Sequence, residues 1–159
     1  PEPVALDALL ERCVRAVREE YPGVTITRGT VAESVRVAGV LEPVFENVVE
    51  NAAEHNTAAD PRVWIDAGVD DERVQVTVGD NGPGIDDHER AVLKRGTETP
   101  LEHGSGLGLW LVKWGTDIVG GQVTFAQNDP TGTVITLEIP VLSRPVGVES
   151  ESETGATAD

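Results

Sequence analysis

Two stretches of alternating apolar residues, joined by a short acidic segment, constrain the fold of this chain most strongly. Every second residue is apolar over residues 63–69 and again over residues 74–78. A period of two is typical of a β-strand that buries one of its faces. The segment Asp70-Asp71-Glu72 lies between the two stretches and favours a turn. The pattern therefore predicts a β-hairpin.

Other segments repeat their apolar residues with the 3.6-residue spacing of an amphipathic helix. This spacing predicts helices over residues 6–17, 41–53 and 107–119. Pro43 falls in the first turn of the second helix, where proline is tolerated, and Gly120-Gly121 closes the third. Shorter apolar patterns predict further strands over residues 24–28, 34–37, 122–126 and 133–139.

These elements predict one α+β domain over residues 1–142, a two-layer α/β sandwich in which a mixed sheet carries its helices on one face. A chain of 159 residues with 39% apolar content is long enough for one such core. Residues 86–103 show no sustained period, which predicts a mobile loop with one helical turn near residues 90–95. Residues 143–159 lose their apolar anchors and predict an acidic, disordered tail.

Composition excludes several classes of function. The net charge of −16 makes nucleic acid a poor partner, because phosphate binding requires dense basic residues. No apolar run approaches the roughly 20 residues of a membrane-spanning helix, so we expect a cytoplasmic piece without direct membrane contact. The spread of acidic residues favours a salt-adapted surface over the alternative, an acidic interaction surface. The start at Pro1 favours a piece of a longer protein.

The only cysteine, Cys13, lies on the apolar side of the first predicted helix. A single cysteine cannot form an internal disulfide, and core packing explains its position. We assign it no chemical role.

Asn47 and Asn51 are four residues apart in the second predicted helix, so their amides project from one face. Amide oxygens are hard ligands of the kind that Mg²⁺ accepts together with waters and phosphates. The alternative is that both side chains are merely solvated. The pair is therefore a candidate metal site.

Asp80 follows a predicted strand and leads into Asn81-Gly82-Pro83-Gly84. A carboxylate fixed at a strand end can accept a hydrogen bond from the exocyclic amine of adenine, while the glycines let backbone approach a flat base. The alternative is an Asx-turn residue with a local role.

Gly104, Gly106 and Gly108 stand directly before the third predicted helix. Free backbone N–H groups and the helix dipole attract anions at such a position, and a flexible hinge is the alternative. The spacing matches neither the Walker nor the dinucleotide-binding glycine pattern.

In this order, the three motifs resemble the ATP-binding catalytic domain of sensor histidine kinases, within the superfamily of DNA gyrase, mismatch-repair and heat-shock chaperone ATPases. Residues 47–51 resemble the N box, residues 80–84 the first glycine box and residues 104–108 the second. The resemblance runs from about residue 6 to residue 140. It implies a Bergerat-type sandwich in which residues 86–103 form an ATP lid.

The resemblance also implies roles for single residues. Asn51 would be the principal Mg²⁺ ligand with Asn47 as its helper, and Asp80 would bind adenine. The lid residues Lys94 and Arg95 would face the phosphates, whereas His55 would contact the nucleotide or pack at the helix end. The remaining implied contacts to ATP come from Gly82, Gly84, Ile85, Gly104, Ser105, Gly106, Leu107, Gly108, Leu109 and Thr133.

Hydrolytic relatives carry glutamate at the position of Asn47, where it activates water. An amide cannot take that proton, so Asn47 favours phosphotransfer over hydrolysis unless Glu46 or Glu50 substitutes. Two departures from the family stand out. Glu54 replaces a lysine that many relatives carry, and the lid lacks phenylalanine, with Leu93 as the candidate for its apolar role.

The resemblance implies a transferase, the catalytic part of a protein-histidine kinase in a two-component system. The phosphate acceptor would be a histidine on a separate dimerisation domain of the same protein, followed by a response regulator. His88-Glu89 lies in the predicted lid without the helical context of such an acceptor. The alternatives are a serine kinase like the anti-sigma-factor kinases and a non-catalytic nucleotide sensor. We expect the isolated piece to be a monomer.

Overall fold

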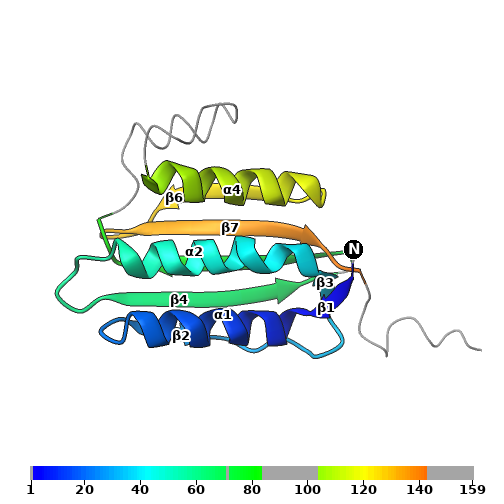
Figure 1. Ribbon diagram of the computed structural model, residues 1–159, viewed down its shortest axis with the longest axis horizontal. Helices are drawn as coiled ribbons and strands as arrows, with labels where there is room; N and C mark the ends of the chain where they lie inside the picture. Colours follow the sequence, from blue (N-terminus) through cyan, green and yellow to red (C-terminus); the bar gives the residue numbers. More distant parts are fainter. Residues whose placement is uncertain (1, 71, 84–103, 143–159) are drawn as a thin grey trace, which may run out of the picture.

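The computed structural model describes residues 2–70, 72–83 and 104–142, in which helices cover one face of a β-sheet (Figure 1). The elements in chain order are β1 (Pro3–Ala5), α1 (Leu6–Glu20), β2 (Thr25–Arg28), β3 (Arg36–Ala38), the 3₁₀ turn η1 (Gly39–Leu41), α2 (Glu42–Glu54), β4 (Arg62–Val69), β5 (Arg73–Asp80), α4 (Gly104–Ile118), β6 (Gln122–Gln127) and β7 (Thr133–Pro140).

The main sheet has five strands in the order β2-β4-β5-β7-β6. Strands β2 and β4 are parallel and the other neighbours are antiparallel, which confirms the predicted mixed sheet. The β4–β5 hairpin has the predicted connection, with Val69 opposite Val74. The two-layer α+β sandwich with its helices on one face is therefore confirmed.

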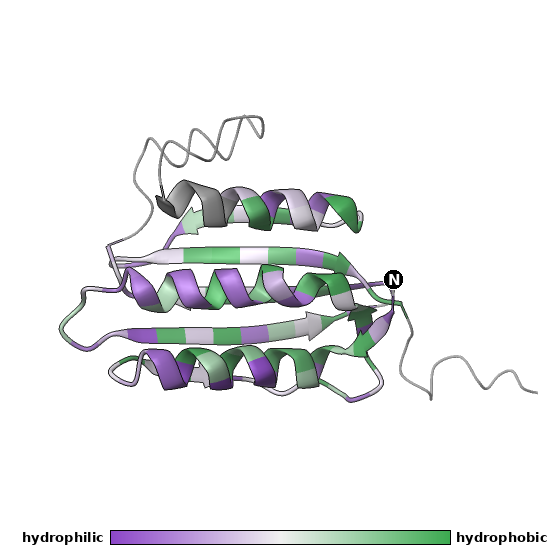
Figure 2. Cartoon of the chain, in the orientation of Figure 1, coloured by the Kyte–Doolittle hydropathy of each residue, from purple (hydrophilic) through white to green (hydrophobic). Residues whose placement is uncertain are grey.

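The core lies between the sheet and the helices. Alternate residues of β4, β5 and β7 point to this side, and Figure 2 shows the resulting bands of hydrophilic and hydrophobic residues along β4 and β7. Burying these side chains stabilises the fold by roughly 1.5–3 kcal/mol for each large residue. The largest fully buried side chains are Phe45, Leu6, Leu9, Leu10, Leu41, Ile65, Leu137, Ile139, Val14, Val35, Val37 and Val48.

Strand β1 was not predicted, because three residues are too few to show a period. It pairs with β3 in a separate two-stranded sheet, with Pro3 opposite Ala38. Strand β3 covers residues 36–38, whereas the pattern had predicted residues 34–37. Asp80 is the last residue of β5, opposite Val63, and not a residue just beyond the strand. Pairing with β4 extends β5 past the last alternating valine.

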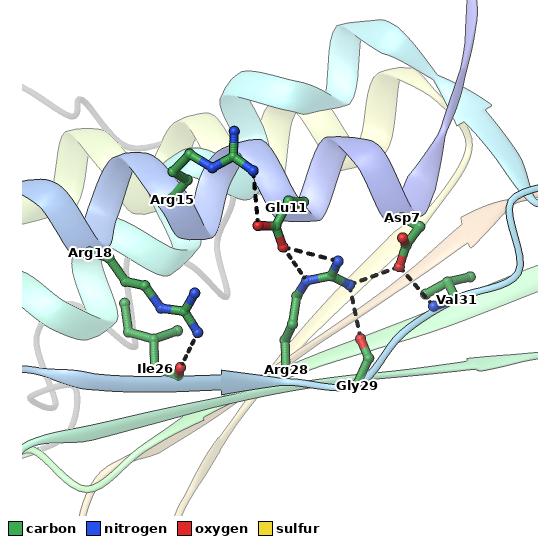
Figure 3. Close-up of polar contacts among 8 residues, drawn as sticks. All are labelled: Asp7, Glu11, Arg15, Arg18, Ile26, Arg28, Gly29 and Val31. Carbon is green, nitrogen blue, oxygen red and sulfur yellow. Dashed lines mark hydrogen bonds and ion pairs between the residues drawn. The ribbon is translucent and has the colours of Figure 1, made fainter.

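Helix α1 is fastened to β2 by ion pairs around Arg28 (Figure 3). The guanidinium lies 2.8 Å from the Asp7 carboxylate and 3.1 Å from that of Glu11, and its side chain is only 11% exposed. Asp7 also accepts the backbone N–H of Val31 at 2.9 Å. The hydrogen bond from Arg28, together with that from Val31, lowers the pKa of Asp7 below its ordinary value.

Only part of the apolar face predicted for the last helix is buried: Val119 packs against the core, whereas two of the large residues are exposed. Trp110 and Trp114 stack with ring centroids 5.9 Å apart, but Trp114 is 49% exposed and Ile118 is 56% exposed. The buried side of α4 instead carries Val112, Gly115 and Thr116. The 3.6-residue period had marked the large apolar residues, whereas small residues make the closest contact with the neighbouring helix.

The reason is the close approach of α4 to α2. A Cβ atom added to Gly115 would lie 2.5 Å from Cγ2 of Val44. Heavy atoms do not approach so closely, so this contact requires glycine. The small residues face α2 and the tryptophans lie outside the contact.

Replacing Gly115 with alanine tests this contact. Overpacking costs about 1–3 kcal/mol, and the better helix propensity of alanine offsets less than about 1 kcal/mol of it. We therefore expect Gly115→Ala to lower the free energy of unfolding measured in urea. Val44→Ala should make the same glycine substitution harmless or stabilising, because it removes the clashing atom. Additive effects of the two substitutions would contradict the contact.

Arg28→Met tests the attachment of α1. It leaves Asp7 partly buried without its cation, and we expect the free energy of unfolding at neutral pH to fall by about 2 kcal/mol. Because the pKa of Asp7 is lowered from its ordinary value of 3.8, the stabilisation is present above that value and is lost as the pH falls through the lowered pKa. The difference between the parent and Arg28→Met, followed by chemical denaturation across pH, should shrink on acidification.

Arg15→Met is the matched control, because Arg15 pairs with Glu11 but is 68% exposed. Exposed pairs contribute little, so this variant should unfold like the parent. Equal losses in the two variants would show that α1 is not held through Arg28.

Candidate nucleotide-binding site

Asn47 and Asn51 lie on α2 and are both half-buried. The Asn47 Nδ2 donates to the carbonyl oxygen of Pro43 at 2.9 Å, so its Oδ1 is the atom left for a ligand. Across the described segments, the Asn51 Nδ2 is the one buried side-chain nitrogen or oxygen without a hydrogen-bond partner. A buried polar atom without a partner costs free energy.

Asp80 is buried at the end of β5, with 8% of its surface exposed. Its Oδ1 accepts the backbone N–H groups of Gly82 at 2.9 Å and of Thr133 at 3.3 Å. No lysine or arginine in the described part of the chain pairs with the carboxylate. Burial raises the pKa of Asp80, and the two N–H groups oppose that rise. The bond to Gly82 is the predicted Asx-type turn, and it leaves Oδ2 as an acceptor.

Asn56, just beyond α2, holds the loop that follows Asp80. Its Nδ2 donates to Oδ1 of Asn81 at 2.9 Å and to the carbonyl of Arg62 at 3.3 Å. Asn81 in turn accepts the N–H of Arg62 at 2.8 Å and donates to the carbonyl of Asp60 at 2.9 Å. A Cβ atom on Gly82 would lie 3.1 Å from Cα of Asn56. The loop is therefore tightly packed against the end of α2.

The β6–β7 turn holds the same loop from the other side. The Asn128 Nδ2 donates to the carbonyl of Asp80 at 2.8 Å, and the Thr131 hydroxyl donates to the carbonyl of Asn81 at 3.2 Å. Sequence reasoning missed Asn56 and Asn128 as parts of this site. Their positions next to turns gave no signal, because asparagine in a turn is common for local reasons.

The glycines of the third motif lie inside the helix and not in front of it. Helix α4 begins at Gly104, whereas apolar spacing had predicted a start at residue 107. Glycine and serine add nothing to an apolar period, so the pattern could not detect the first turn. Gly104, Ser105, Gly106, Leu107, Gly108 and Leu109 thus form the start of α4, where backbone N–H groups lack helical partners.

The three motifs lie at the same end of the molecule (Figure 1). Asn56 joins the end of α2 to the Asp80 loop through its 2.9 Å hydrogen bond to Asn81. The later part of α4, at Gly115, packs on Val44 near the start of α2. The two helices are therefore antiparallel, so the start of α4 lies toward the Asn51 end of α2.

His55 ends α2 through its backbone N–H, which bonds to the carbonyl of Asn51 at 3.3 Å. Its imidazole is 53% exposed, with Nε2 lying 3.8 Å from the Glu54 carboxylate.

Thr133 is 6% exposed beside Asp80. The predicted contacts at Gly84, Ile85, Lys94 and Arg95 lie outside the described residues, as do the predicted lid at 86–103 and the tail at 143–159.

Residues 37–143 match the family described as "Histidine kinase-, DNA gyrase B-, and HSP90-like ATPase". The match covers more than half of the chain, and the chain therefore belongs to this family. The predicted histidine-kinase type of ATP-binding catalytic domain is confirmed by the relatives below.

The sensor-type histidine kinase PrrB of Mycobacterium leprae is 31% identical over 143 residues, which cover 86% of this chain and 31% of PrrB. The sensor protein KdpD of Escherichia coli is 29% identical over 73% of this chain and 14% of KdpD. This chain thus spans about a third or less of the length of these relatives.

Solved structures agree with the fold. The ATP-binding domain of PrrB from Mycobacterium tuberculosis superposes with a TM-score of 0.70 at 25% identity, covering 89% of this chain and 98% of that domain. The mycobacterial sensor histidine kinase MprB gives 0.68 at 27% identity, over 90% of this chain and 100% of the other. In the described part of this chain, no helix has both the length and the apolar character needed to cross a membrane.

Asp80→Asn tests the cost of the buried carboxylate. The amide keeps an oxygen for the N–H groups of Gly82 and Thr133 but carries no charge. The pKa of Asp80 is raised above its ordinary value of 3.8. The ionised carboxylate therefore destabilises the folded state at neutral pH, and this destabilisation is absent once the pH falls below 3.8. We expect Asp80→Asn to raise the melting temperature of nucleotide-free protein at pH 7, with the gain disappearing on acidification.

Asp129→Asn makes the same chemical change at an exposed position in the β6–β7 turn. It should give no comparable gain at any pH. A loss of stability in Asp80→Asn at pH 7 would show that the ionised carboxylate stabilises the loop.

Proposed function

We propose that this chain binds Mg-ATP between the end of α2, the Asp80 loop and the start of α4, and presents the γ-phosphate to a histidine on a separate dimerisation domain of the same protein. The observation that carries the proposal is the buried Asp80 carboxylate, which has backbone N–H partners and no cation in the segments described. Membership in the family and the convergence of the three motifs support it.

Asp80 would accept a hydrogen bond from the exocyclic amine of adenine through Oδ2. Its Oδ1 is already occupied by the N–H groups of Gly82 and Thr133, so the carboxylate has a fixed orientation. Fixed acceptors discriminate strongly, because a ligand that cannot donate leaves the buried oxygen unpaired.

The amides of Asn51 and Asn47 fit a magnesium site. Amide oxygens are the atoms that would bind the metal: the Oδ1 of Asn47 is free of the Pro43 bond, which uses Nδ2, and Asn51 lies one turn further along the same helix. Oxygen ligands from one or two side chains suffice for Mg²⁺ when phosphates and waters complete the set. A bound magnesium ion would neutralise phosphate charge. The role of the two amides is to hold the ATP phosphates in a defined position relative to Asp80.

The start of α4, residues 104–109, would face the phosphates. Helix N-termini offer unpaired N–H groups and the positive end of the dipole. Lys94 and Arg95 are the proposed lid cations, and Gly84 and Ile85 are proposed to line the base. Phosphoryl transfer needs mainly alignment and charge neutralisation, which these groups would supply.

Transfer is favoured over hydrolysis because Asn47 cannot accept a proton from water. Of the two candidate substitutes, Glu46 is exposed. Glu50 lies near Glu20 on α1, whose charge is one cause of the raised pKa of Glu50, after burial. Because α1 and α4 contact different sides of α2, Glu50 faces away from the proposed phosphate position.

The matched proteins PrrB and MprB are named sensor histidine kinases, and nothing in the described site favours the serine-kinase or the non-catalytic alternative. A response regulator is the proposed next acceptor. A cytoplasmic location, a salt-adapted surface, a monomeric piece and the absence of nucleic-acid binding stay predictions.

Binding measurements on two variants test the site. Removing the charged acceptor in Asp80→Ala should weaken ATP binding by roughly 10- to 100-fold, since a hydrogen bond to a charged group contributes about 1.5–3 kcal/mol. Asn51→Ala should abolish the increase in ATP affinity on adding magnesium. Glu46→Ala, an exposed change on the same helix, is the control and should bind like the parent. Parent-like binding by Asp80→Ala would disprove the adenine assignment.

The transfer reaction is tested with a supplied dimerisation hairpin and radiolabelled ATP. The expected product is an acid-labile, alkali-stable phosphate on the hairpin, which is the behaviour of phosphohistidine. An acid-stable product would support the serine kinase. ATP binding with no transfer would support the nucleotide sensor.

A further inference from the structure

We propose that Asn128, in the β6–β7 turn, is a positioning residue for Asp80, so that this turn sets the preference of the site for bases with an exocyclic amine. The inference rests on the proposed function and adds a residue that no motif contains. Asn128 is separated from Asp80 by 48 positions and contacts it directly through the Nδ2 bond of 2.8 Å.

Asn128 provides a hydrogen-bond donor to Asp80 at the point where the pairing of β5 with β7 has ended. The last β5–β7 pair is Gly79 with Val134, and the last β6–β7 pair is Gln127 with Thr133. Asp80 therefore has no β7 partner in the ladder. The Asn128 amide donates to its carbonyl oxygen instead, and the Asn128 Oδ1 accepts the N–H of Asp129 at 2.9 Å, which fixes the orientation of that amide.

The rest of the turn lies against the same peptide. Gly132 has a positive φ of 109°, and a Cβ atom there would lie 1.9 Å from the carbonyl oxygen of Asp80. The carbonyl of Gly132 accepts the N–H of Asn128 at 2.9 Å. Thr133, the next residue, donates its N–H to the Asp80 carboxylate. One turn thus holds both the carbonyl and the carboxylate of Asp80.

On the side of α2, the bond to the Asp80 carboxylate comes from the N–H of Gly82, which packs against Asn56. Asn56 itself donates to Asn81 and to the carbonyl of Arg62, but no hydrogen bond joins it to Asp80 among the described residues. The β6–β7 turn is the element that fixes the carbonyl of Asp80, and Thr133 at the start of β7 adds the second bond to its carboxylate. A displacement of this turn changes the direction in which Oδ2 faces the base, and hydrogen bonds weaken steeply with angle.

The test compares ATP with the triphosphate of purine riboside, whose base lacks the exocyclic amine. Asn128→Asp keeps the size of the side chain and the acceptor for Asp129, but replaces the donor facing the Asp80 carbonyl with an oxygen. We expect the dissociation constant for ATP to rise roughly 5- to 10-fold, the range of one lost hydrogen bond. The dissociation constant for the purine riboside triphosphate should change less than about twofold, because it makes no bond to the carboxylate.

Gln127→Glu is the matched control. It makes the same amide-to-carboxylate change one position earlier, at an exposed residue, and so adds the same charge near the site. It should leave the ratio of the two dissociation constants unchanged. Thr131→Val removes the hydroxyl bond to Asn81 with little change in volume, and we expect a smaller loss of about twofold to threefold, again for ATP alone. If circular dichroism shows that Asn128→Asp is poorly folded, Thr131→Val still tests the proposal.

The double variant Asn128→Asp with Asp80→Ala completes the test. If Asn128 acts through Asp80, its substitution has no further effect on ATP binding once the carboxylate is removed. Equal weakening of both nucleotides, or additive losses in the double variant, would overturn the positioning role. Parent-like behaviour of Asn128→Asp beside a weakened Asp80→Ala would overturn this inference and leave the proposed function intact. Parent-like ATP binding by Asp80→Ala would overturn the adenine assignment itself.

Discussion

The sheet is apolar on one face only, and this asymmetry decides where the other elements lie. The buried residues of β4, β5 and β7 alternate with exposed ones, so α1, α2 and α4 must cover the same side. Their ends and the ends of the central strands then meet along one edge of the sandwich (Figure 1). Polar groups at that edge gain partial burial without breaking the core. The proposed site uses this edge.

Asp80 is a buried charged group that destabilises the fold, and the loop around it limits this destabilisation. Burial without a nearby cation raises the pKa of Asp80 because it disfavours the ionised carboxylate. The two backbone N–H groups reduce this free-energy cost of ionisation without neutralising the charge. A lysine or arginine next to the Asp80 carboxylate would stabilise the loop, but it would also occupy the acceptor oxygen. The arrangement keeps the oxygen available as an acceptor.

Sequence predicted the parts of the structure that depend on periodicity and local chemistry. The β4–β5 hairpin, α2 with Pro43 in its first turn, and the mixed sheet all follow from patterns within single segments. The buried face of α4 could not be predicted in this way, because Gly115 contacts Val44, a residue far away in the chain. The roles of Asn56 and Asn128 at the site could not be predicted for the same reason. Their partners are defined by tertiary contacts, and neither belongs to a motif.

The contact at Gly115 also bears on the distance between the proposed magnesium and phosphate groups. Helices α2 and α4 are antiparallel, and Gly115 meets Val44 seven residues before Asn51 and eleven after Gly104. An α-helix rises 1.5 Å per residue and is stiff over this length, so the separation at this contact is transmitted along both helices to the edge where the motifs meet. The small residues of α4 face α2, and the stacked tryptophans lie outside. A more apolar helix face would bury more surface but would hold the two motif-bearing ends farther apart.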